Sequence, residues 1–544
     1  MSTNNTIKRN SFIEGAALSY IAMIVIKVLG ALYSIPFYSL IGDKGGFLYS
    51  CAYNVYVFFL DISTSGIPVA LSILIGEYNA LEMYGSKEKA YKLGRNIVAV
   101  IALAAFAFMQ IAATPLANFF LTDMTTGATV AEVAIAIRVV STCLLVVPFL
   151  SVLRGYMLGH KFIAVSSNTQ LIEQIIRIAV VLIGAYVTLR VFHMDLIVAV
   201  STALSGAAIG AFGALLYLIH KKTKNANLFP TTTRNEVIDT NSVIVHKLVG
   251  YSVVVILISI ASNVYFIVDM KLLLHGLHRI GYADTDAQTI ASITSTWIPK
   301  ITNIVTALAL AMTSSIAPHI ADDYAVRNYK GIQHKINQAF RVIILLALPM
   351  SVGLIGFADS IYCMFYGHND FGTYILMVTS VVNIALTGAN LLGMSLQSMN
   401  RGKIVCFATI TGIVANASLD LPLIYLFNRI GFRPYLGAVW SSVIGQSLTC
   451  IILTAYLYKK TPVRYTEAMV TLRRAIPPLA VMSASVWLFR KVWPVVEQRG
   501  LLQVFQLLVA AVVCAGIFYL TAFATRAMDK DVVRELIRER LKRD

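Results

Sequence analysis

The chain has 544 residues, of which 58% are apolar and 13% are Asp, Glu, Lys or Arg. A soluble domain of this length carries about twice that charged fraction, so lipid rather than water surrounds most of the chain. This balance excludes a soluble globular protein. The net charge of +17 has the sign expected of a nucleic-acid binder, but basic loops on the cytoplasmic side of a membrane explain it better.

Fourteen apolar segments follow one another along the chain, most of them about 20 residues or longer. Backbone within a membrane must satisfy its hydrogen bonds internally, which leaves helices or closed barrels. Barrel strands of about ten residues are too short for these runs, so the segments predict an all-α polytopic membrane protein. The segments are 12–41, 47–79, 95–121, 130–153, 162–190, 195–219, 243–275, 289–319, 338–358, 372–399, 403–428, 435–458, 474–494 and 501–525.

The distribution of basic residues predicts the orientation. If the N-terminus lies inside, the inner segments hold 31 of the 44 Lys and Arg residues and the outer loops hold eight. Lys and Arg collect on the cytoplasmic side of bacterial-type membranes. The pattern therefore predicts a multi-pass protein of a bacterial-type plasma membrane with both termini in the cytoplasm, and it requires no nucleic-acid partner.

A weak internal repeat and one long linker indicate a duplication. Residues 72–95 and 314–341 each contain a small-residue helix end, an acid–Tyr element, a basic loop and the start of a new helix, about 245 positions apart. Duplicated bundles are a common transporter plan, with the substrate held between them. We expect a six-helix N-lobe over 1–230, a six-helix C-lobe over 231–460, two further helices over 461–526 and a basic amphipathic cytoplasmic tail over 527–544.

Nine ionisable side chains lie within the apolar segments, where each needs a cavity or a partner. Five are bases and four are acids, which indicates a shared aqueous cavity suited to an anionic substrate. The nine are Lys27, Asp61, Arg138, Glu173, Arg177, Asp269, Lys271, Lys300 and Asp420.

Three of these nine side chains allow two interpretations. Glu173 and Arg177 are four residues apart and share a helical face, so they form either a structural ion pair or part of the cavity. Lys27 lies too deep for its ammonium to reach water at either surface. It is either a cavity cation that meets an anionic substrate or a structural partner of Asp61 or another acid.

Asn416 and Asp420 repeat the four-residue spacing shortly before Pro422. An amide oxygen and a carboxylate on one face near a helix break can bind a hard cation, and Asp269 could add a third oxygen. A carboxylate that exchanges a proton, or that is only hydrogen-bonded, fits the same spacing. The loops are too short for a catalytic domain and carry no recognised catalytic motif, so we expect no enzymatic activity.

Six stretches in chain order resemble a known family: Lys27–Pro36, Gly66–Ser72, Arg154–Gly159, Gln170–Arg177, Leu348–Ala358 and Leu396–Lys403. They resemble the polysaccharide-biosynthesis and SpoVB branch of the multidrug/oligosaccharidyl-lipid/polysaccharide (MOP) flippase superfamily. MurJ-type lipid II flippases belong to the same superfamily. The resemblance covers most of residues 12–458.

The resemblance implies two six-helix lobes in a V shape around a cationic cavity, two extra helices and alternating access. At Lys27 the family usually has arginine, so this chain keeps the charge but loses the planar bidentate fork. The resemblance also implies a sodium site at Asp269, Asn416 and Asp420, completed by Ser441 or Ser442. The predicted substrate-binding residues are Lys27, Asp61, Arg138, Arg154, Glu173, Arg177, Lys271 and Lys300.

We therefore expect a flippase, coupled to Na⁺ or H⁺, that moves an undecaprenyl-pyrophosphate-linked saccharide, above all lipid II, from the inner to the outer leaflet. We expect it to be a monomer in contact with membrane lipid. Two alternatives stay open: a flippase for another lipid-linked polysaccharide unit, and an ion-coupled multidrug exporter. An exporter favours an acidic, aromatic cavity and normally has twelve helices. A membrane glycosyltransferase would need catalytic carboxylates in long outer loops, and these loops are short.

Overall fold

The computed structural model describes residues 12–122, 124–229, 238–314, 316–461, 463–495 and 499–528. Most of these residues are helical, and none of the described residues lies in a β-strand. The all-α polytopic fold expected from the sequence is therefore confirmed. Nearly all of the predicted amphipathic tail over 527–544 lies outside the described residues.

Eleven helical segments of the described chain are long and apolar enough to cross a membrane. Three of the fourteen predicted segments, 12–41, 289–319 and 474–494, are not among these eleven. The first has a shorter apolar helical stretch, Ile21–Leu32. The second is divided among several helical pieces, and the third contains three prolines and three bases. The count of fourteen spans is compatible with the structure and stays a prediction.

The chain forms two compact units, residues 1–300 (unit 1) and 301–544 (unit 2). In unit 1, α9 follows the long linker and packs against α2, α3 and α4. The lobe boundary predicted at 230/231 stays a prediction. The helices of unit 1 are α1 (Phe12–Leu32), α2 (Ser34–Thr64), α3 (Ile67–Ala80), α4 (Tyr84–Leu121), α5 (Val130–Ser141), α6 (Val147–Gly159), α7 (Ile163–Tyr186), α8 (Leu196–Lys224), α9 (Asn241–Arg279) and α10 (Asp284–Ser292), with shorter helical pieces at Thr142–Leu145, Val187–Val191, Ala226–Leu228 and Ile293–Trp297.

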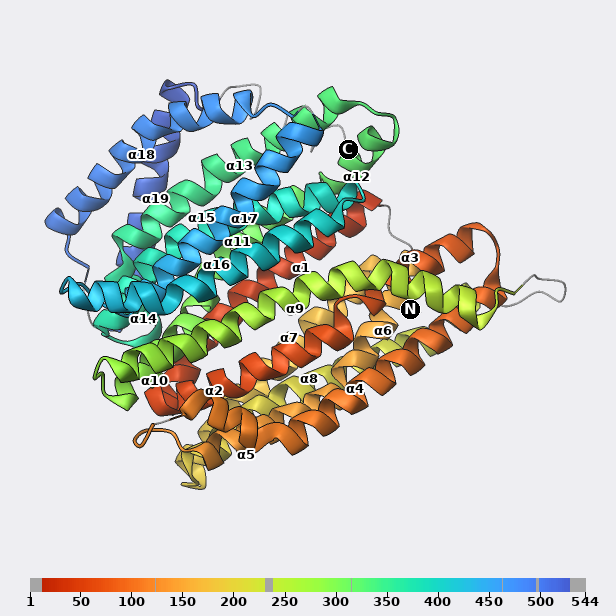
Figure 1. Ribbon diagram of the computed structural model, residues 1–544, viewed down its shortest axis with the longest axis horizontal. Helices are drawn as coiled ribbons and strands as arrows, with labels where there is room; N and C mark the ends of the chain where they lie inside the picture. The colour runs from red at the N-terminus through yellow and green to blue at the C-terminus, as the bar shows by residue number, and fades with distance from the viewer. Residues whose placement is uncertain are drawn as a thin grey trace, which may run out of the picture. The chain divides into compact units, whose positions relative to one another are not determined.

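Within unit 1 the long helices lie side by side, with α7 packed on α8 and α4 on α5 (Figure 1). Gly210 of α8 makes the first of these contacts close, because a Cβ there would lie 2.7 Å from the carbonyl oxygen of Glu173. Small residues let membrane helices approach in this way. The glycine therefore fixes the distance between α8 and the part of α7 that carries Glu173.

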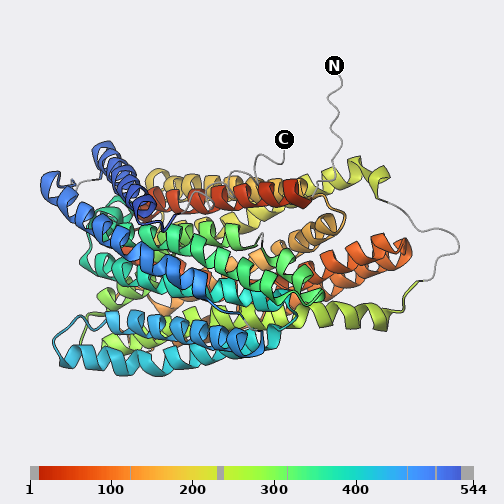
Figure 2. The ribbon, with the colours of Figure 1, turned by 90° about the horizontal axis from the view of Figure 1, so that it is seen from above.

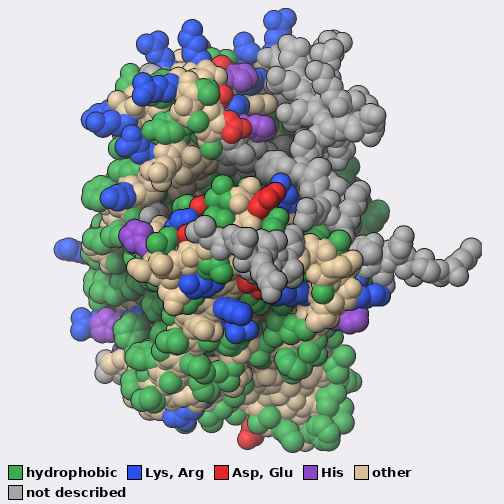
Figure 3. All heavy atoms as spheres, turned by 90° about the vertical axis from the view of Figure 1, so that its right-hand side faces the viewer, with side chains coloured by type: hydrophobic (Ala, Val, Ile, Leu, Met, Phe, Trp, Pro, Cys, Tyr) green, Lys and Arg blue, Asp and Glu red, His purple; other side chains and the backbone are tan. Residues whose placement is uncertain are grey.

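One end of unit 1 gathers polar contacts around Asp239, which directly precedes α9. The Tyr78 hydroxyl donates to Asp239 Oδ2 at 2.6 Å, and Lys89 Nζ donates to the Asp239 carbonyl oxygen at 2.9 Å. Lys247 Nζ lies 2.9 Å from Glu77 Oε1. Figure 3 faces the end at which α3 ends and α4 and α9 begin, where many Lys and Arg side chains are visible. These contacts tie the end of the linker to α3 and α4.

At the opposite end of unit 1, Asp284, the first residue of α10, holds the loop after α4 by hydrogen bonds. Its Oδ2 accepts hydrogen bonds from the backbone N–H groups of Thr125 at 2.8 Å and Thr126 at 3.1 Å. Nδ1 of His278 lies 2.8 Å from Asp284 Oδ1. Burial opposes ionisation of Asp284, but these hydrogen bonds outweigh it and hold the pKa of the carboxyl below its usual value of 3.8. The loop after α4 is thereby fastened to the turn between α9 and α10.

In unit 2, α16 packs on α17, α15 on α17 and α13 on α18, and the long helices again lie side by side (Figures 1 and 2). Buried apolar side chains of α13, α18 and α19 form one core. The two C-terminal helices are thus part of unit 2 rather than an appendage. Its helices are α11 (Ile298–Ser314, which begins in unit 1), α12 (Ala317–Ala325), α13 (Tyr329–Gly356), α14 (Ala358–Tyr366), α15 (Asp370–Ser398), α16 (Gly402–Arg429), α17 (Leu436–Lys460), α18 (Thr466–Val492) and α19 (Leu501–Ala524).

Candidate functional site

A cluster of two guanidinium groups around one carboxylate joins α6 to α7 in unit 1. Arg154 Nη2 donates to Glu173 Oε2 at 2.9 Å, and Arg177 pairs with the other oxygen of the same carboxylate. Arg154 Nε also donates to Thr169 Oγ1 at 2.9 Å. Thr169, Glu173 and Arg177 are four residues apart along α7, so one helical face presents all three. The Glu173 side chain is only 11% exposed.

Two cations that share one anion leave this cluster with a net positive charge. Charge-assisted hydrogen bonds to Glu173 hold both guanidinium groups in fixed positions. The ion pair predicted from the spacing on α7 is therefore present. The second base of the cluster is Arg154, which the sequence resemblance had implied as a substrate ligand. Because Arg154 lies on α6, the spacing of residues on α7 does not reveal its contact with Glu173. The cluster can attract an anion, but each base already donates to the carboxylate.

Lys300 lies among three aromatic rings of unit 1. Its Nζ is 4.1 Å from the centroid of the Trp297 ring, 5.0 Å from that of Tyr33 and 5.1 Å from that of Tyr49. The negative faces of aromatic rings stabilise an ammonium in this geometry. Sequence reasoning missed these rings. The signal was the aromatic density of residues 33–59, to which Tyr33 and Tyr49 belong.

The structure separates Lys27 from Asp61. Asp61 Oδ2 accepts a hydrogen bond from Asn263 Nδ2 at 2.7 Å, which links α2 to α9. Lys27 on α1 is exposed, and it forms no ion pair with any residue that the structure describes. An amide therefore takes the place of the ammonium that was one predicted partner of Asp61. The role of Lys27 in substrate binding stays a prediction.

Arg138 and Lys271 do not join the cluster around Glu173. Arg138 Nη2 donates to Thr114 Oγ1 on α4 at 3.4 Å. Lys271 Nζ donates to Thr122 Oγ1 at 2.9 Å, and Thr122 directly follows the end of α4. Lys271 therefore lies nearer a helix end than its position in the apolar segment suggests. The roles of Arg138 and Lys271 in substrate binding stay predictions.

Unit 2 brings together a second polar cluster between α16 and α17. Asn416 Nδ2 donates to Asp420 Oδ1 at 3.2 Å and lies 2.9 Å from Ser441 Oγ. The Ser441 hydroxyl donates to the same Asp420 oxygen, whereas the Ser442 hydroxyl donates to the carbonyl oxygen of Ala438 at 3.1 Å. The Ser441 hydroxyl thus contacts both Asn416 and Asp420. Asp420 is 0% exposed.

The donor set of this cluster fits a hard cation in part. A carboxylate and a hydroxyl are suitable oxygen ligands, but Asn416 turns its amide nitrogen toward them. The two ends of an amide are assigned from the hydrogen-bond network, and a half-turn of the side chain would present its oxygen. Asp269 is buried in unit 1, and its place in such a site stays a prediction. The described residues contain no group of three or more His, Cys, Asp or Glu able to hold a metal.

The fold and these clusters define the class of protein. Multiple apolar helices make it a multi-pass membrane protein, and ionisable side chains at membrane depth typically mark the paths of ions or polar substrates. Two family models match the chain: a polysaccharide biosynthesis protein model over residues 12–281 and a MatE model over residues 255–421. The chain belongs to the MOP flippase superfamily, and it is a membrane transporter rather than an enzyme.

Two curated relatives and one solved structure cover most of the chain. The lipid II flippase MurJ of Bacillus subtilis (strain 168) is 28% identical over 526 residues, which are 94% of each chain. Stage V sporulation protein B of the same organism is 21% identical over 84% of this chain and 85% of its own. A structure of lipid II flippase MurJ in an inward closed conformation matches with a TM-score of 0.60 at 16% identity, over 92% of this chain and 99% of that one.

Proposed function

We propose that this protein moves an undecaprenyl-pyrophosphate-linked saccharide, specifically the peptidoglycan precursor lipid II, from the inner to the outer leaflet by alternating access. The observation that carries the proposal is the net positive cluster of Arg154, Glu173 and Arg177 within a membrane-spanning bundle. Such a cluster suits the anionic headgroup of a lipid better than the cations that multidrug exporters carry. Similarity to a lipid II flippase over 94% of both chains supports the same substrate.

In this proposal the bases of unit 1 have different roles in binding the pyrophosphate. Lys27 is accessible and makes the first contact with the pyrophosphate, because its ammonium has no carboxylate partner among the described residues. Arg154 and Arg177 supply a fixed positive field, since Glu173 holds both in place. The Lys300 ammonium, held against aromatic rings, adds a further charge. As a point charge without the planar fork of arginine, Lys27 binds phosphate with less geometric specificity.

The cluster on α16 and α17 supports a proposal for ion coupling. Na⁺ would bind the carboxylate of Asp420 and the hydroxyl of Ser441, with the Asn416 amide turned to present its oxygen. The sequence resemblance also implies Asp269 as a ligand. An ion shifts a conformational equilibrium only if it binds the two states with different affinity. Coupling thus requires these residues to separate in one of the two states.

We also propose a membrane orientation, an oligomeric state and a position for the lipid tail. The excess of Lys and Arg in alternate loops supports cytoplasmic termini in a bacterial-type cell membrane. A monomer is sufficient, because a duplicated bundle supplies both halves of a transport path within one chain. The ligand is a lipid, so its isoprenoid tail stays in the bilayer while the headgroup crosses.

The proposal is tested with the purified full-length chain in liposomes that contain fluorescent lipid II. We expect the protein to move lipid II between leaflets, Lys27→Ala to abolish this transport and Lys27→Arg to retain it. Lys92→Ala, which removes an exposed lysine of α4, is the matched control and should transport normally. Complementation of cells that lack their own lipid II flippase provides the second readout. Absence of lipid II movement in both assays would refute the proposal.

One observation favours an ion-coupled multidrug exporter as the second candidate, namely the MatE match over residues 255–421. Sensitivity of cells to cationic drugs, measured with and without the protein, separates the two. Drug resistance without lipid II transport would select the exporter. Transport of a different lipid-linked saccharide, with no activity on lipid II, would instead select a flippase for another polysaccharide unit.

A further inference from the structure

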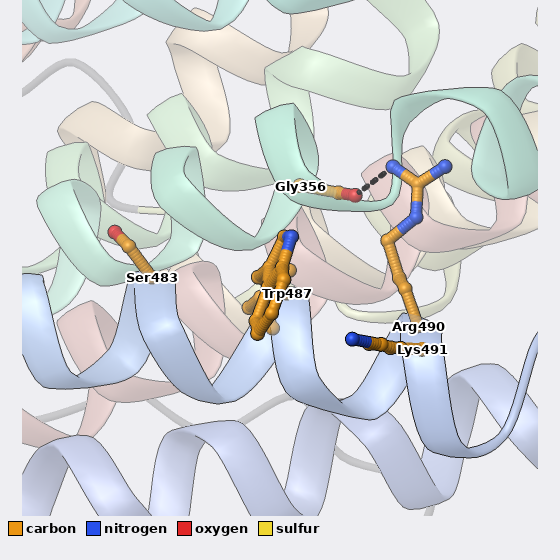
Figure 4. A pocket seen from close by; sticks show the side chains of 6 residues that line it. Gly356, Ser483, Trp487, Arg490 and Lys491 are labelled. Atoms are coloured by element: carbon orange, nitrogen blue, oxygen red, sulfur yellow. Dashed lines mark hydrogen bonds between the residues drawn. The ribbon is translucent and has the colours of Figure 1, made fainter.

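A recess opens on the surface of unit 2 where the end of α13 meets the end of α18. Its volume is about 450 Å³, within the range of roughly 300–1,000 Å³ that small ligands occupy in proteins. Figure 4 shows the side chains of Trp487, Arg490 and Lys491 extending from α18 beside Gly356 of α13. Val486 and Ser483 complete the lining.

The two bases of this recess are held differently. Arg490 Nη1 donates to the Gly356 carbonyl oxygen at 2.8 Å, and Nη2 lies 2.5 Å from Asp359 Oδ2. Arg490 is thus oriented and largely neutralised. Lys491 lies with its Nζ 5.2 Å from the centroid of the Trp487 ring, and no described residue gives it a carboxylate partner. Among the residues that the structure describes, the Lys491 ammonium therefore has no opposing carboxylate, and it lies beside the fixed guanidinium of Arg490.

A helix C-terminus attracts bases in its last turn, and this accounts for some of the charge at the end of α18. It does not account for the exposed indole, because Trp487 is 64% exposed. Leu488 and Val492, which flank these residues on α18, are exposed apolar side chains. An exposed tryptophan next to Lys and Arg, with apolar side chains alongside, is typical of the level at which lipid headgroups meet acyl chains.

The bases at this end of α18 are also unusual for the predicted orientation, which places few Lys and Arg residues on the outer side. The orientation proposed above assigns eight Lys and Arg residues to the outer side. Three of them lie close together: Arg490 and Lys491 in the last turn of α18, and Arg499 between α18 and α19. Arg499 is used structurally, since it donates to the carbonyl oxygens of Cys363 at 3.2 Å and Phe365 at 3.1 Å. Lys491 makes no hydrogen bond of this kind to any described residue, so a ligand gives a reason for its position.

The geometry points to a binding site for an anionic phospholipid, with its phosphate at Lys491 and Arg490, its glycerol region against Trp487, and its chains along Leu488 and Val492. Phosphatidylglycerol has this chemistry, and phosphatidylcholine, which is neutral overall, does not. The lipid would stay bound as a structural ligand of α13 and α18. The proposed lipid site is therefore separate from the site of the transported substrate. Its existence does not depend on which substrate the protein moves.

The test measures retention of phosphatidylglycerol and phosphatidylcholine on the full chain by native mass spectrometry after identical detergent exchange. A lysine near a lipid phosphate contributes about fivefold to affinity, so Lys491→Gln should lower phosphatidylglycerol retention by about that factor. Phosphatidylcholine retention should not change. Trp487→Leu should weaken both lipids, because it removes the indole surface. The matched control is Lys403→Gln, an exposed lysine at the start of α16, which should behave like the wild type.

Three outcomes would overturn the inference. Equal retention of the two lipids by the wild type would mean that charge plays no part, and an unchanged preference in Lys491→Gln would place the charge-dependent site elsewhere. Displacement of phosphatidylglycerol by undecaprenyl pyrophosphate, with loss of that ligand in Lys491→Gln, would assign the recess to the transported lipid. Thermal unfolding of each variant shows whether the fold is intact, and Trp487→Leu gives an independent result if Lys491→Gln is unstable.

Discussion

Glu82 and Arg327 occupy the same position in two turns of the same shape, 245 residues apart. Their φ angles are +58° and +56°, in the left-handed region that residues other than glycine rarely adopt. In each case a long helix starts two residues later, α4 at Tyr84 and α13 at Tyr329. The two turns of the predicted repeat thus share one backbone conformation.

The hydrogen bonds of the two turns agree as well. The N–H of Met83 donates to the carbonyl oxygen of Tyr78 at 2.9 Å, and the N–H of Asn328 donates to that of Asp323 at 2.8 Å. The acceptors are again 245 residues apart. Matching strain and matching hydrogen bonds at one offset support descent of the two halves from one duplicated bundle.

Replacing Glu173 by glutamine should destabilise the protein, because Arg154 and Arg177 would lose their shared counter-charge. Breaking a buried ion pair costs about 3 kcal/mol or more in unfolding free energy. Thermal unfolding in detergent measures the loss. Glu467→Gln is the control, since the Glu467–His334 pair is exposed and worth less than about 1 kcal/mol. Equal melting of the two variants would contradict a stabilising role for the cluster.

Ser441→Ala and Ser442→Ala form a matched pair on α17. Removing the Ser441 hydroxyl takes one donor from Asp420, whereas the Ser442 hydroxyl donates to a carbonyl oxygen of its own helix. A hydrogen bond to a charged group is worth about 1.5–3 kcal/mol, so Ser441→Ala should raise the Na⁺ concentration needed for half-maximal transport roughly tenfold or more. Ser442→Ala should change it little. Transport that is indifferent to Na⁺ in the wild type would remove the ion from the proposal.

The loop after α4 should open at low pH, because Asp284 holds it in its ionised form. A carboxyl with a lowered pKa stabilises the fold above its ordinary value of 3.8, and that stabilisation is lost as the pH falls through the lowered value. The protection factors of the Thr125 and Thr126 amides, which correct for the intrinsic exchange rate at each pH, should therefore fall below about pH 4. Asp284→Asn should lower them at neutral pH. Asp286→Asn, an exposed neighbour on α10, should not.

Gly210→Ala should force α7 and α8 apart, since its Cβ would lie 2.7 Å from the backbone oxygen of Glu173. We expect overpacking of about 1–3 kcal/mol and a weaker ion cluster, visible as a lower melting temperature. Gly516→Ala on α19 is the contrasting case, because a Cβ there meets nothing within 4 Å. That variant should melt at the wild-type temperature or above it, since alanine favours helix by up to about 1 kcal/mol.

Helical spacing explains which parts of the site could be predicted from the sequence. Glu173 with Arg177, and Asn416 with Asp420, are neighbours because residues four apart share a helical face. The length of each apolar run is likewise a local property of the sequence, and it was enough to predict the all-helical fold. Contacts between helices depend on packing, which no spacing encodes, so Asn263 as the partner of Asp61 was not foreseen.

Lys271 shows that an apolar run in the sequence does not fix how deep each of its residues lies in the membrane. α9 has 39 residues, and at 1.5 Å per residue it is roughly 58 Å long, far more than the hydrocarbon core of about 30 Å. A residue inside the apolar stretch of such a helix can lie near its end. The contact of Lys271 with Thr122 places it there.

The position of Trp297 gives the protein a built-in optical reporter. It is 0% exposed and lies against the Lys300 ammonium, whereas Trp440, Trp487 and Trp493 are all exposed. An indole that is shielded from water emits at shorter wavelength than one at a surface. Arrival of a phosphate near Lys300 would change the electric field at that single ring, so substrate entry could be timed in the unlabelled protein by stopped-flow fluorescence.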